Sequence, residues 1–189
     1  MPENSEKRDR TRAKLKLALV ELCDEKPYYD ITIGDICDRA KSYRSTFYRY
    51  YDSKDAMLRE IEHEYIADTC NLTPTLWDFH TDASPEAFED YRRELIADME
   101  YHRAHSKICI FLLSPAGDIY FHSKMVESVN NSVRKNFQKY SIHHARNIDY
   151  FLNFFAVGFV STIYEWLKKD DCSPSEMADF LLSMMKDLY

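Results

Sequence analysis

The chain has 189 residues, of which 45% are hydrophobic and 14% aromatic, so it can bury a core and is too apolar to be disordered. Its 3 Gly and 6 Pro disfavour a turn-rich all-β fold and favour helices. The net charge of −7 is uneven: residues 1–60 carry 13 Lys and Arg against 12 Asp and Glu, and residues 61–189 carry 12 against 20. Residues 1–60 thus have a net charge of +1, and residues 61–189 have a net charge of −8.

No apolar run approaches the roughly 18 to 20 residues of a membrane span, and the amino terminus lacks the apolar segment of a signal peptide. We therefore predict a cytoplasmic protein without a membrane partner. The cysteines are odd in number, widely spaced and without a CxxC pair, which favours reduced thiols over disulfides or a zinc site. They are Cys23, Cys37, Cys70, Cys109 and Cys172. The sequence predicts no metal and no cofactor.

The first helices follow from apolar spacing and capping signals. Apolar residues recur at helical spacing from about Arg8 to Lys26, and Pro27 ends that pattern. Thr32 is a good N-cap, with Asp35 placed to complete a capping box, so a second helix is expected to about residue 40. After a short turn, residues 44–51 are expected to form a third helix.

The rest of the chain is predicted to be helical as well, since no period-two strand pattern persists. The expected later helices cover residues 53–70, 84–104, 106–113, 118–140, 148–168 and 174 to the carboxyl terminus. Pro85 and Pro174 stand at first helical positions behind Ser N-caps. The prediction is an all-α fold of about nine helices, with a DNA-binding domain over residues 1–53 and a helical domain over residues 54–189.

The helix–turn–helix segment has the chemistry of a DNA-reading surface. Between Arg39 and Arg49 there are four basic residues and no acid, with aromatic residues among them. A short helix rich in Arg, Ser, Thr and Tyr after a tight turn is typical of proteins that enter the major groove. The alternative is that these Arg residues form a solvated face. The basic run from Lys7 to Lys16 has the same two interpretations, phosphate contact or solvation.

The residues that carry this pattern resemble those of the tetracycline-repressor-like (TetR/AcrR) regulators. The resemblance covers Arg10 to Leu58 and rests on ITIGDICDRA, KSY and RSTFYRYYDSKDAML, while AVGFVSTIYEWLKKDDCSPSEMADFL resembles the last two helices of many members. Residues 70–145 show no recognisable match. Members usually have Gly where Lys41 stands, and often a small apolar residue and Ser at positions 42 and 43. A left-handed Lys41 would cost about 1 kcal/mol relative to Gly.

The resemblance implies roles for individual residues, and their chemistry agrees. The resemblance assigns contacts with base edges to Arg44, Ser45 and Tyr48. Arg can pair with guanine, and Tyr offers a hydroxyl and an apolar ring. Phosphate contacts, which set register rather than sequence, are assigned to Thr32, Thr46, Arg49, Tyr50 and Lys54. Phe47 and Tyr51 are expected in the core.

The later helices are expected to sense and to dimerise. Candidates for an effector pocket are the aromatic and Met residues of the middle region: Trp77, Tyr91, Met99, Tyr101, Phe111, Tyr120, Phe121 and Met125. The nearby acids Glu94, Asp98 and Glu127 would suit a lipophilic cation. A twofold interface of the last two helices is expected to include Phe155, Phe159, Trp166, Phe180 and Met184. Each of these residues could instead belong to the core.

The leading hypothesis is a homodimeric, ligand-responsive transcriptional regulator, most simply a repressor, that binds a palindromic DNA operator and releases it when a small-molecule effector binds. The alternative is a helical protein-interaction or co-regulator module of the same fold that has lost DNA binding, a possibility raised by the Lys41-Ser42-Tyr43 turn. An enzyme is not expected, because the sequence has no nucleophile–base pair and no phosphate-binding glycine loop. The operator, the effector and the sign of regulation stay open.

Overall fold

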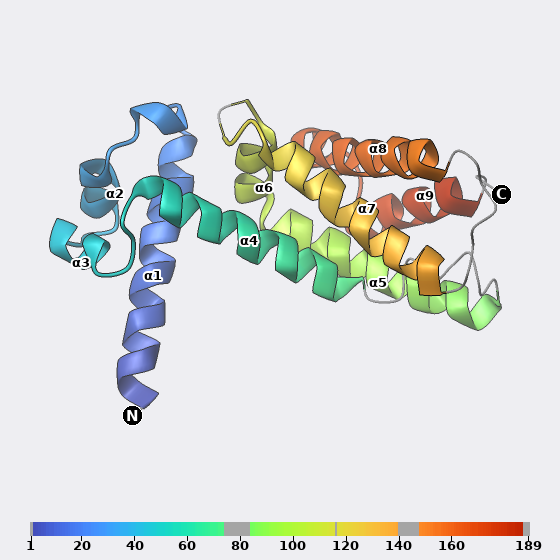
Figure 1. Ribbon diagram of the computed structural model, residues 1–189, viewed down its shortest axis with the longest axis horizontal. Helices are drawn as coiled ribbons and strands as arrows, with labels where there is room; N and C mark the ends of the chain where they lie inside the picture. The colour runs from blue at the N-terminus through green and yellow to red at the C-terminus, as the bar shows by residue number, and fades with distance from the viewer. Residues whose placement is uncertain (1, 74–83, 116, 140–147, 187–189) are drawn as a thin grey trace. The chain divides into compact units, whose positions relative to one another are not determined.

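The computed structural model describes residues 2–73, 84–115, 117–139 and 148–186. Over these residues every regular element is helical, which confirms the predicted all-α fold (Figure 1). The α-helices are α1 (Pro2–Cys23), α2 (Ile33–Arg39), α3 (Arg44–Tyr48), α4 (Lys54–Leu72), α5 (Pro85–Ala104), α6 (Ser106–Leu113), α7 (Phe121–Lys139), α8 (Ile148–Lys169) and α9 (Pro174–Lys186), with a 3-10 turn, η1 (Tyr28–Asp30), between α1 and α2. None of the described helices is long and apolar enough to cross a membrane.

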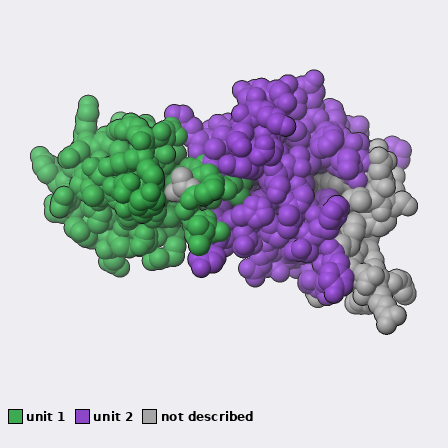
Figure 2. Space-filling model, turned by 90° about the horizontal axis from the view of Figure 1, so that it is seen from above, with its two compact units in different colours: residues 1–65, 111–119 green, residues 66–110, 120–189 purple. Residues whose placement is uncertain are grey.

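The described chain divides into two compact units (Figure 2). The first comprises residues 1–65 and 111–119, and the second comprises residues 66–110 and 120–189. The first unit thus includes the first half of α4 as well as the three amino-terminal helices. The domain boundary predicted between residues 53 and 54 remains a prediction about domain organisation.

The core of the first unit is built from the apolar faces of its short helices. Leu15 and Leu19 of α1, Ile36 of α2, Phe47 of α3 and Met57 of α4 are all fully buried. Each of α2 and α3 is too short to be stable alone, so tertiary burial of these side chains holds them in place.

Helix α1 begins at Pro2, six residues before the predicted start, and its added turns carry Lys7.

Capping signals fixed several helix starts as predicted. The Thr32 hydroxyl accepts from the backbone N–H of Asp35 at 3.1 Å, and the Asp35 carboxylate accepts from the backbone N–H of Thr32 at 2.8 Å. The same reciprocal pair joins Ser173 and Glu176 at the start of α9. Ser84 caps α5 through the Ala87 N–H. These bonds satisfy backbone donors that have no partner within the helix.

The second unit is held by two helix pairs, α5 with α9 and α7 with α8. Leu95 and Met99 of α5 are fully buried, as is Leu152 of α8. Arg92 of α5 donates to both carboxylate oxygens of Asp179 on α9, at 2.6 and 3.0 Å. This two-point contact restricts the orientation of α5 relative to α9 and also adds electrostatic attraction.

Candidate nucleic-acid interface

The turn between α2 and α3 keeps the geometry of a regular helix ending. Lys41 adopts φ 51°, in the left-handed region that the resemblance implied. Ser42 N–H donates to Cys37 C=O at 2.8 Å, and Lys41 N–H donates to Asp38 C=O at 3.2 Å. Together these bonds form a Schellman motif, in which a left-handed residue ends a helix and satisfies its last carbonyls. Lys41 therefore occupies a left-handed position that glycine adopts at a lower conformational cost, and the hydrogen bonds of the turn are intact.

Helix α3 exposes the side chains predicted to read bases. Arg44, Ser45 and Tyr48 are exposed, Tyr48 by 56%. Phe47 on the opposite face is fully buried and packs against Tyr51 with ring centroids 5.6 Å apart. This burial confirms that the two rings belong to the core. Because Phe47 is buried and Arg44, Ser45 and Tyr48 are exposed, this short helix presents its polar face to solvent.

The Arg44 side chain lies against the first turn of α2. A Cβ atom placed on Gly34 would stand 2.6 Å from Arg44 Nη2, so the glycine leaves room for the guanidinium. The arginine is exposed and its guanidinium stands at the end of a flexible side chain. It can therefore leave this position to meet a guanine edge without rearrangement of the helices.

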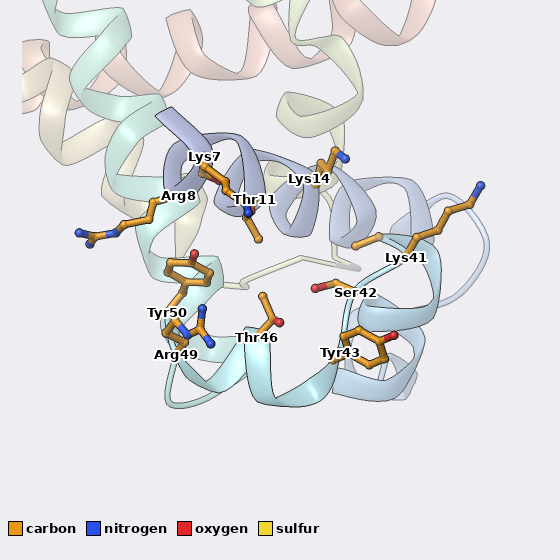
Figure 3. Close-up of a pocket in the computed structure, with 11 residues that line it drawn as sticks. Lys7, Arg8, Thr11, Lys14, Lys41, Ser42, Tyr43, Thr46, Arg49 and Tyr50 are labelled. Atoms are coloured by element: carbon orange, nitrogen blue, oxygen red, sulfur yellow. The ribbon is translucent and has the colours of Figure 1, made fainter. Parts of the chain in front are cut away.

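Three of the predicted phosphate-binding residues line one groove. Thr46, Arg49 and Tyr50 form part of its α3 side, and Lys7 and Thr11 of α1 lie opposite them (Figure 3). The groove has a volume of ≈ 650 Å³, and all the residues that line it belong to the first unit. The structure thus brings together residues from the basic run of α1 and residues from α3 that are more than thirty positions apart in the sequence.

Lys54, also predicted to contact phosphate, has other partners in this structure. Its Nζ donates to the backbone carbonyls of Tyr28 at 2.7 Å, Tyr29 at 3.2 Å and Ile31 at 2.7 Å, and lies 4.4 Å from the centre of the Tyr28 ring. An ammonium group has three N–H donors, and all three are used. These hydrogen bonds tie η1 to the start of α4. A phosphate contact would require Lys54 to give them up, and the phosphate role remains a prediction.

Thr32 is occupied by its capping box. Its hydroxyl donates to the Asp35 carboxylate at 2.9 Å, and Lys26 pairs with the same carboxylate at 2.7 Å. The hydrogen bonds from Lys26 and Thr32 hold the pKa of Asp35 well below its ordinary value. The carboxylate is therefore charged at neutral pH. The phosphate role predicted for Thr32 places an anion beside this carboxylate and remains a prediction.

The cations of α1 fall into two groups. Arg12 pairs with Glu60 of α4 at 2.5 Å, and Lys16 pairs with Glu60 and Glu64 at 2.5 and 2.6 Å. Burial of Glu60 opposes its ionisation, but hydrogen bonds from Lys16, Arg12 and Tyr51 outweigh burial and lower its pKa. Arg12 and Lys16 thus bind α1 to α4, whereas Lys7 turns toward the groove.

Tyr43 is a candidate that the sequence analysis did not single out. It is the N-cap residue of α3, its side chain makes no capping hydrogen bond, and 80% of it is exposed. It also lines the groove. The sequence carried a signal for it, because the resemblance leads one to expect Ser at this position. A large exposed ring where a small capping residue is favoured makes Tyr43 a candidate for a surface contact.

Comparison with known proteins decides the family. Residues 17–61 match the family described as "Bacterial regulatory proteins, tetR family", and residues 89–187, more than half of the chain, match "Transcriptional regulator C-terminal region". The chain belongs to the TetR family. It is a transcriptional regulator with a helix-turn-helix DNA-binding domain, and the prediction that it is not an enzyme is confirmed by the nature of this family. A search of curated proteins gives no match.

Solved structures share the fold at low sequence identity. A putative TetR-family regulator from Syntrophomonas wolfei is 18% identical with a TM-score of 0.69, covering 95% of each chain. A TetR regulator from Streptococcus agalactiae is 21% identical with a TM-score of 0.62, covering 96% of each. The dihydroxyacetone kinase operon activator DhaS is 17% identical with a TM-score of 0.62, covering 94% of this chain and 95% of its own.

In this TetR-family chain the predicted effector residues occupy different environments. Tyr91, Met99, Phe121 and Met125 are buried in the second unit, whereas Phe111 is buried in the first. Tyr101 is half-buried and donates from its hydroxyl to Asp68 at 2.8 Å. Tyr120 is 66% exposed, and Trp77 lies outside the described residues. The pocket assignment remains a prediction for all eight residues.

A buried polar cluster lies among the predicted effector residues of the TetR chain. His102 Nε2 stands 3.5 Å from Asp98 Oδ2, and His102 Nδ1 stands 4.0 Å from the Cys109 sulfur. Burial alone would lower the pKa of His102, but attraction to Asp98 and hydrogen bonds with Asp98 and Cys109 outweigh it and raise the pKa to about 10. The other Asp98 oxygen, Oδ1, is buried without a hydrogen-bond partner in the described structure.

The residues predicted for a TetR-type dimer interface divide into core and surface. Phe159 and Trp166 are buried within the chain, and the Trp166 indole N–H donates to Cys172 C=O at 3.0 Å. Phe155 is half-buried, while Phe180 and Met184 of α9 are about half exposed, at 49% and 48%. Phe154 and Val157 of α8, which lie in the helix pair that the resemblance assigned to dimerisation, are also exposed, at 74% and 37%.

Proposed function

We propose that this TetR-family regulator acts as a homodimer on a palindromic operator and that a small-molecule effector bound by the helical region releases it. The observation that carries the DNA-binding part is the outward face of α3, where Arg44, Ser45 and Tyr48 are exposed beside buried Phe47. Paired heads about one helical turn apart read a palindrome, which makes the dimer part of the same proposal.

Within this proposal the roles of side chains follow from their surroundings. Arg44, Ser45 and Tyr48 read base edges, and Thr46, Arg49 and Tyr50 set the register through phosphates. Lys54 is a positioning residue, since its donors are used by the carbonyls around η1. Exposed Phe154, Val157, Phe180 and Met184 of α8 and α9 form the surface that a second copy covers, and Phe159 and Trp166 support it from within.

The effector part of the proposal rests on the chemistry of the second unit. Its buried aromatic and Met residues favour a lipophilic molecule, and the unpartnered Asp98 oxygen favours one that bears a cation or a strong hydrogen-bond donor. Release then requires that the effector bind better to the conformation with low operator affinity. Whether binding lowers or raises transcription is a separate matter, and the name of the activator DhaS makes activation the second candidate.

The direct test is a titration of the protein's own promoter region, read by fluorescence anisotropy. We expect salt-sensitive binding that prefers one palindromic segment over arbitrary DNA. Arg44→Ala should relax that preference and cost about 1–3 kcal/mol of binding free energy. Arg59→Ala, an exposed arginine of α4 in the same unit, is the control and should leave the preference unchanged. Equal binding of promoter and arbitrary DNA would support the co-regulator alternative instead.

A further inference from the structure

The second unit contains a surface cleft between α7 and α8, two helices that pack side by side (Figure 1). This α7–α8 cleft has a volume of ≈ 460 Å³, which lies within the range of about 300–1,000 Å³ found for small-molecule sites. None of the residues predicted for the effector pocket is among the described residues that line it. The cleft is therefore a feature separate from that pocket.

Carboxamide side chains line both walls of the α7–α8 cleft. Asn130 and Asn131 belong to α7, and Asn153 belongs to α8. All three stand at interior helical positions, where asparagine is a poor helix former and cannot act as a cap. Each carboxamide has two N–H donors and an acceptor oxygen, so it suits ligand groups that both donate and accept. A hydroxyl is a group of this kind.

Asn130 has a polar atom that the described structure leaves unsatisfied. Its Oδ1 is buried and has no hydrogen-bond partner among the described residues. A buried carbonyl oxygen without a donor costs free energy, and such atoms are rare in folded proteins. Because Asn130 lines the α7–α8 cleft, a donor on a molecule in the cleft can reach this side chain. The position favours a ligand that carries O–H or N–H groups.

The charges of the cleft lie on either side of its asparagines. Glu127 and Arg134 are seven positions apart on α7, which corresponds to about 10 Å along the helix. Arg134 already pairs with Asp149 of α8 at 2.8 Å. A free amino acid carries both of its charges on one carbon atom and cannot span this separation. A neutral polar ligand therefore suits the α7–α8 cleft better than a small zwitterion.

Two valines supply an apolar part of the lining. Val126 of α7 is buried, and Val157 of α8 is 37% exposed. A ring that carries hydroxyl groups also has C–H groups, which can pack on these methyl groups while its hydroxyls meet the polar side chains. Val157 also belongs to the surface assigned above to a second copy of the chain. The ligand would therefore lie at the edge of that surface.

We propose that the α7–α8 cleft binds a neutral, polyhydroxylated molecule of about monosaccharide size. Asn130 accepts a hydrogen bond from one ligand hydroxyl, Asn153 binds the ligand from α8, and Glu127 accepts from a further hydroxyl. The binding is non-covalent. This site goes beyond the proposed regulation of DNA binding, since it requires no DNA. Its ligand class also differs from the lipophilic cation favoured for the effector pocket.

Saturation-transfer NMR on the full chain tests the site, with D-glucose, D-ribose and myo-inositol as the probes. We expect transfer to at least one of the three, with a dissociation constant on the order of 1 mM, because a ligand with few atoms in an open cleft gains little binding energy. Free L-serine, a zwitterion that also carries a hydroxyl, should show no transfer. Absence of transfer to all three probes, or transfer to L-serine alone, would reject the proposal.

Asn130→Leu tests whether the probe is bound in the cleft. Leucine keeps the branched shape of asparagine, lacks its hydrogen-bonding groups and is a better helix former. The variant should weaken binding by about tenfold or more. Its melting temperature should equal or exceed that of wild type, because a buried unsatisfied oxygen is removed. Asn71→Leu is the matched control, an exposed asparagine of α4 in the same unit but outside the cleft, and it should leave binding unchanged.

A second variant keeps the test decisive if Asn130→Leu melts well below wild type. Glu127 is exposed, so Glu127→Gln should fold normally, and loss of its charged acceptor should weaken binding severalfold. Equal binding by wild type and by the variants of Asn130 and Glu127 would show that the probe binds elsewhere and would reject the cleft as its site. Because no DNA is present, a failure of promoter binding leaves this result unchanged, and failure of the cleft leaves the operator proposal intact.

Discussion

At the scale of single residues, the backbone of Lys41 and the N-cap of α3 show where this chain gives up local stability. Lys41 holds a left-handed conformation at the end of α2, and Tyr43 begins α3 without a capping hydrogen bond. Both residues lie in the turn that separates the two helices of the DNA-binding motif. Their substitution should therefore affect stability and DNA binding in opposite directions.

We predict that Lys41→Gly raises the free energy of unfolding by about 0.5–1 kcal/mol, because glycine adopts a positive φ without steric penalty. Urea denaturation of wild type and variant would measure the change. Lys41→Ala is the control, since it removes the same charge and long side chain but keeps the strain. Equal stability of the Gly and Ala variants would show that the backbone of residue 41 is not strained.

A second residue-scale prediction concerns the buried pair of Asp98 and His102. The pKa of His102 is raised to about 10 in the folded protein, above the roughly 6.5 of an exposed histidine. Its protonation therefore adds stability that is fully present below about pH 6.5 and is lost as the pH rises toward about 10. Urea denaturation at a series of pH values should show this decline.

The control for that decline is the double variant Asp98→Asn/His102→Gln, in which the pair cannot ionise. Its stability should change less between pH 6.5 and 10 than that of wild type. Asp98→Asn alone removes the partner of a fully buried imidazolium and should cost about 3–5 kcal/mol at neutral pH. A single variant as stable as wild type would contradict the ion pair.

At the scale of elements, α1 and α4 are joined by a seam of ion pairs. Glu60 accepts from Arg12, Lys16 and Tyr51, and its side chain is only 27% exposed. Isolated surface ion pairs contribute little, but a half-buried carboxylate with three donors contributes more. The ion pairs hold Arg12 and Lys16 on the face of α1 that lies against α4, whereas Lys7 and Lys14 lie on the face that lines the groove.

Glu60→Gln should lower the free energy of unfolding by about 1–2 kcal/mol, because it removes the charge that three donors share. Glu64→Gln is the matched control on the same helix: Glu64 is 53% exposed and pairs only with Lys16 among the described residues, so its loss should cost less than about 0.5 kcal/mol. Because the pKa of Glu60 is lowered, its contribution exists above the ordinary carboxyl pKa and disappears as the pH falls through the folded value. Chemical denaturation at pH 7 and at acid pH measures both effects.

At the scale of the whole molecule, the proposed dimer depends on an apolar surface that the chain itself does not cover. Phe154 and Val157 of α8 and Phe180 and Met184 of α9 are exposed on the last two helices of the chain. Gly158 lies on the exposed side of α8, and a Cβ atom added there would meet nothing within 4 Å. An open glycine on an apolar helix face allows close approach of another helix.

Phe180→Glu should convert a dimer to a monomer, since it buries an unpaired charge in the proposed interface. Sedimentation equilibrium would measure the change in mass. Leu17→Glu is the control, because Leu17 is an exposed apolar residue of α1, at 58%, and lies outside this surface. A wild-type monomer, or two variants with the same mass as wild type, would reject this interface.

The positions of most helices could be predicted from the sequence because their signals are local. The capping boxes of Thr32 and Ser173 each depend on a carboxylate three residues away, and the structure contains both. The start of α1 was predicted six residues too late, since its first turns lack apolar residues at helical spacing. Polar helix turns of this kind carry no periodic signal.

The all-α fold, the helix–turn–helix and the side chains that α3 exposes could be predicted from the sequence, because periodicity, caps and turn chemistry act within a few positions. Which cations are held in ion pairs could not be predicted from the sequence, because their partners lie far along the chain. Arg12 pairs with Glu60, which is 48 residues away, and Lys54 donates to carbonyls 23 to 26 residues away. Lys7 and Lys14, in contrast, line a groove whose lining residues include no acid. Electrostatic pairing depends on distance in space, and that distance is set by the packing of α1 against α2 and α4.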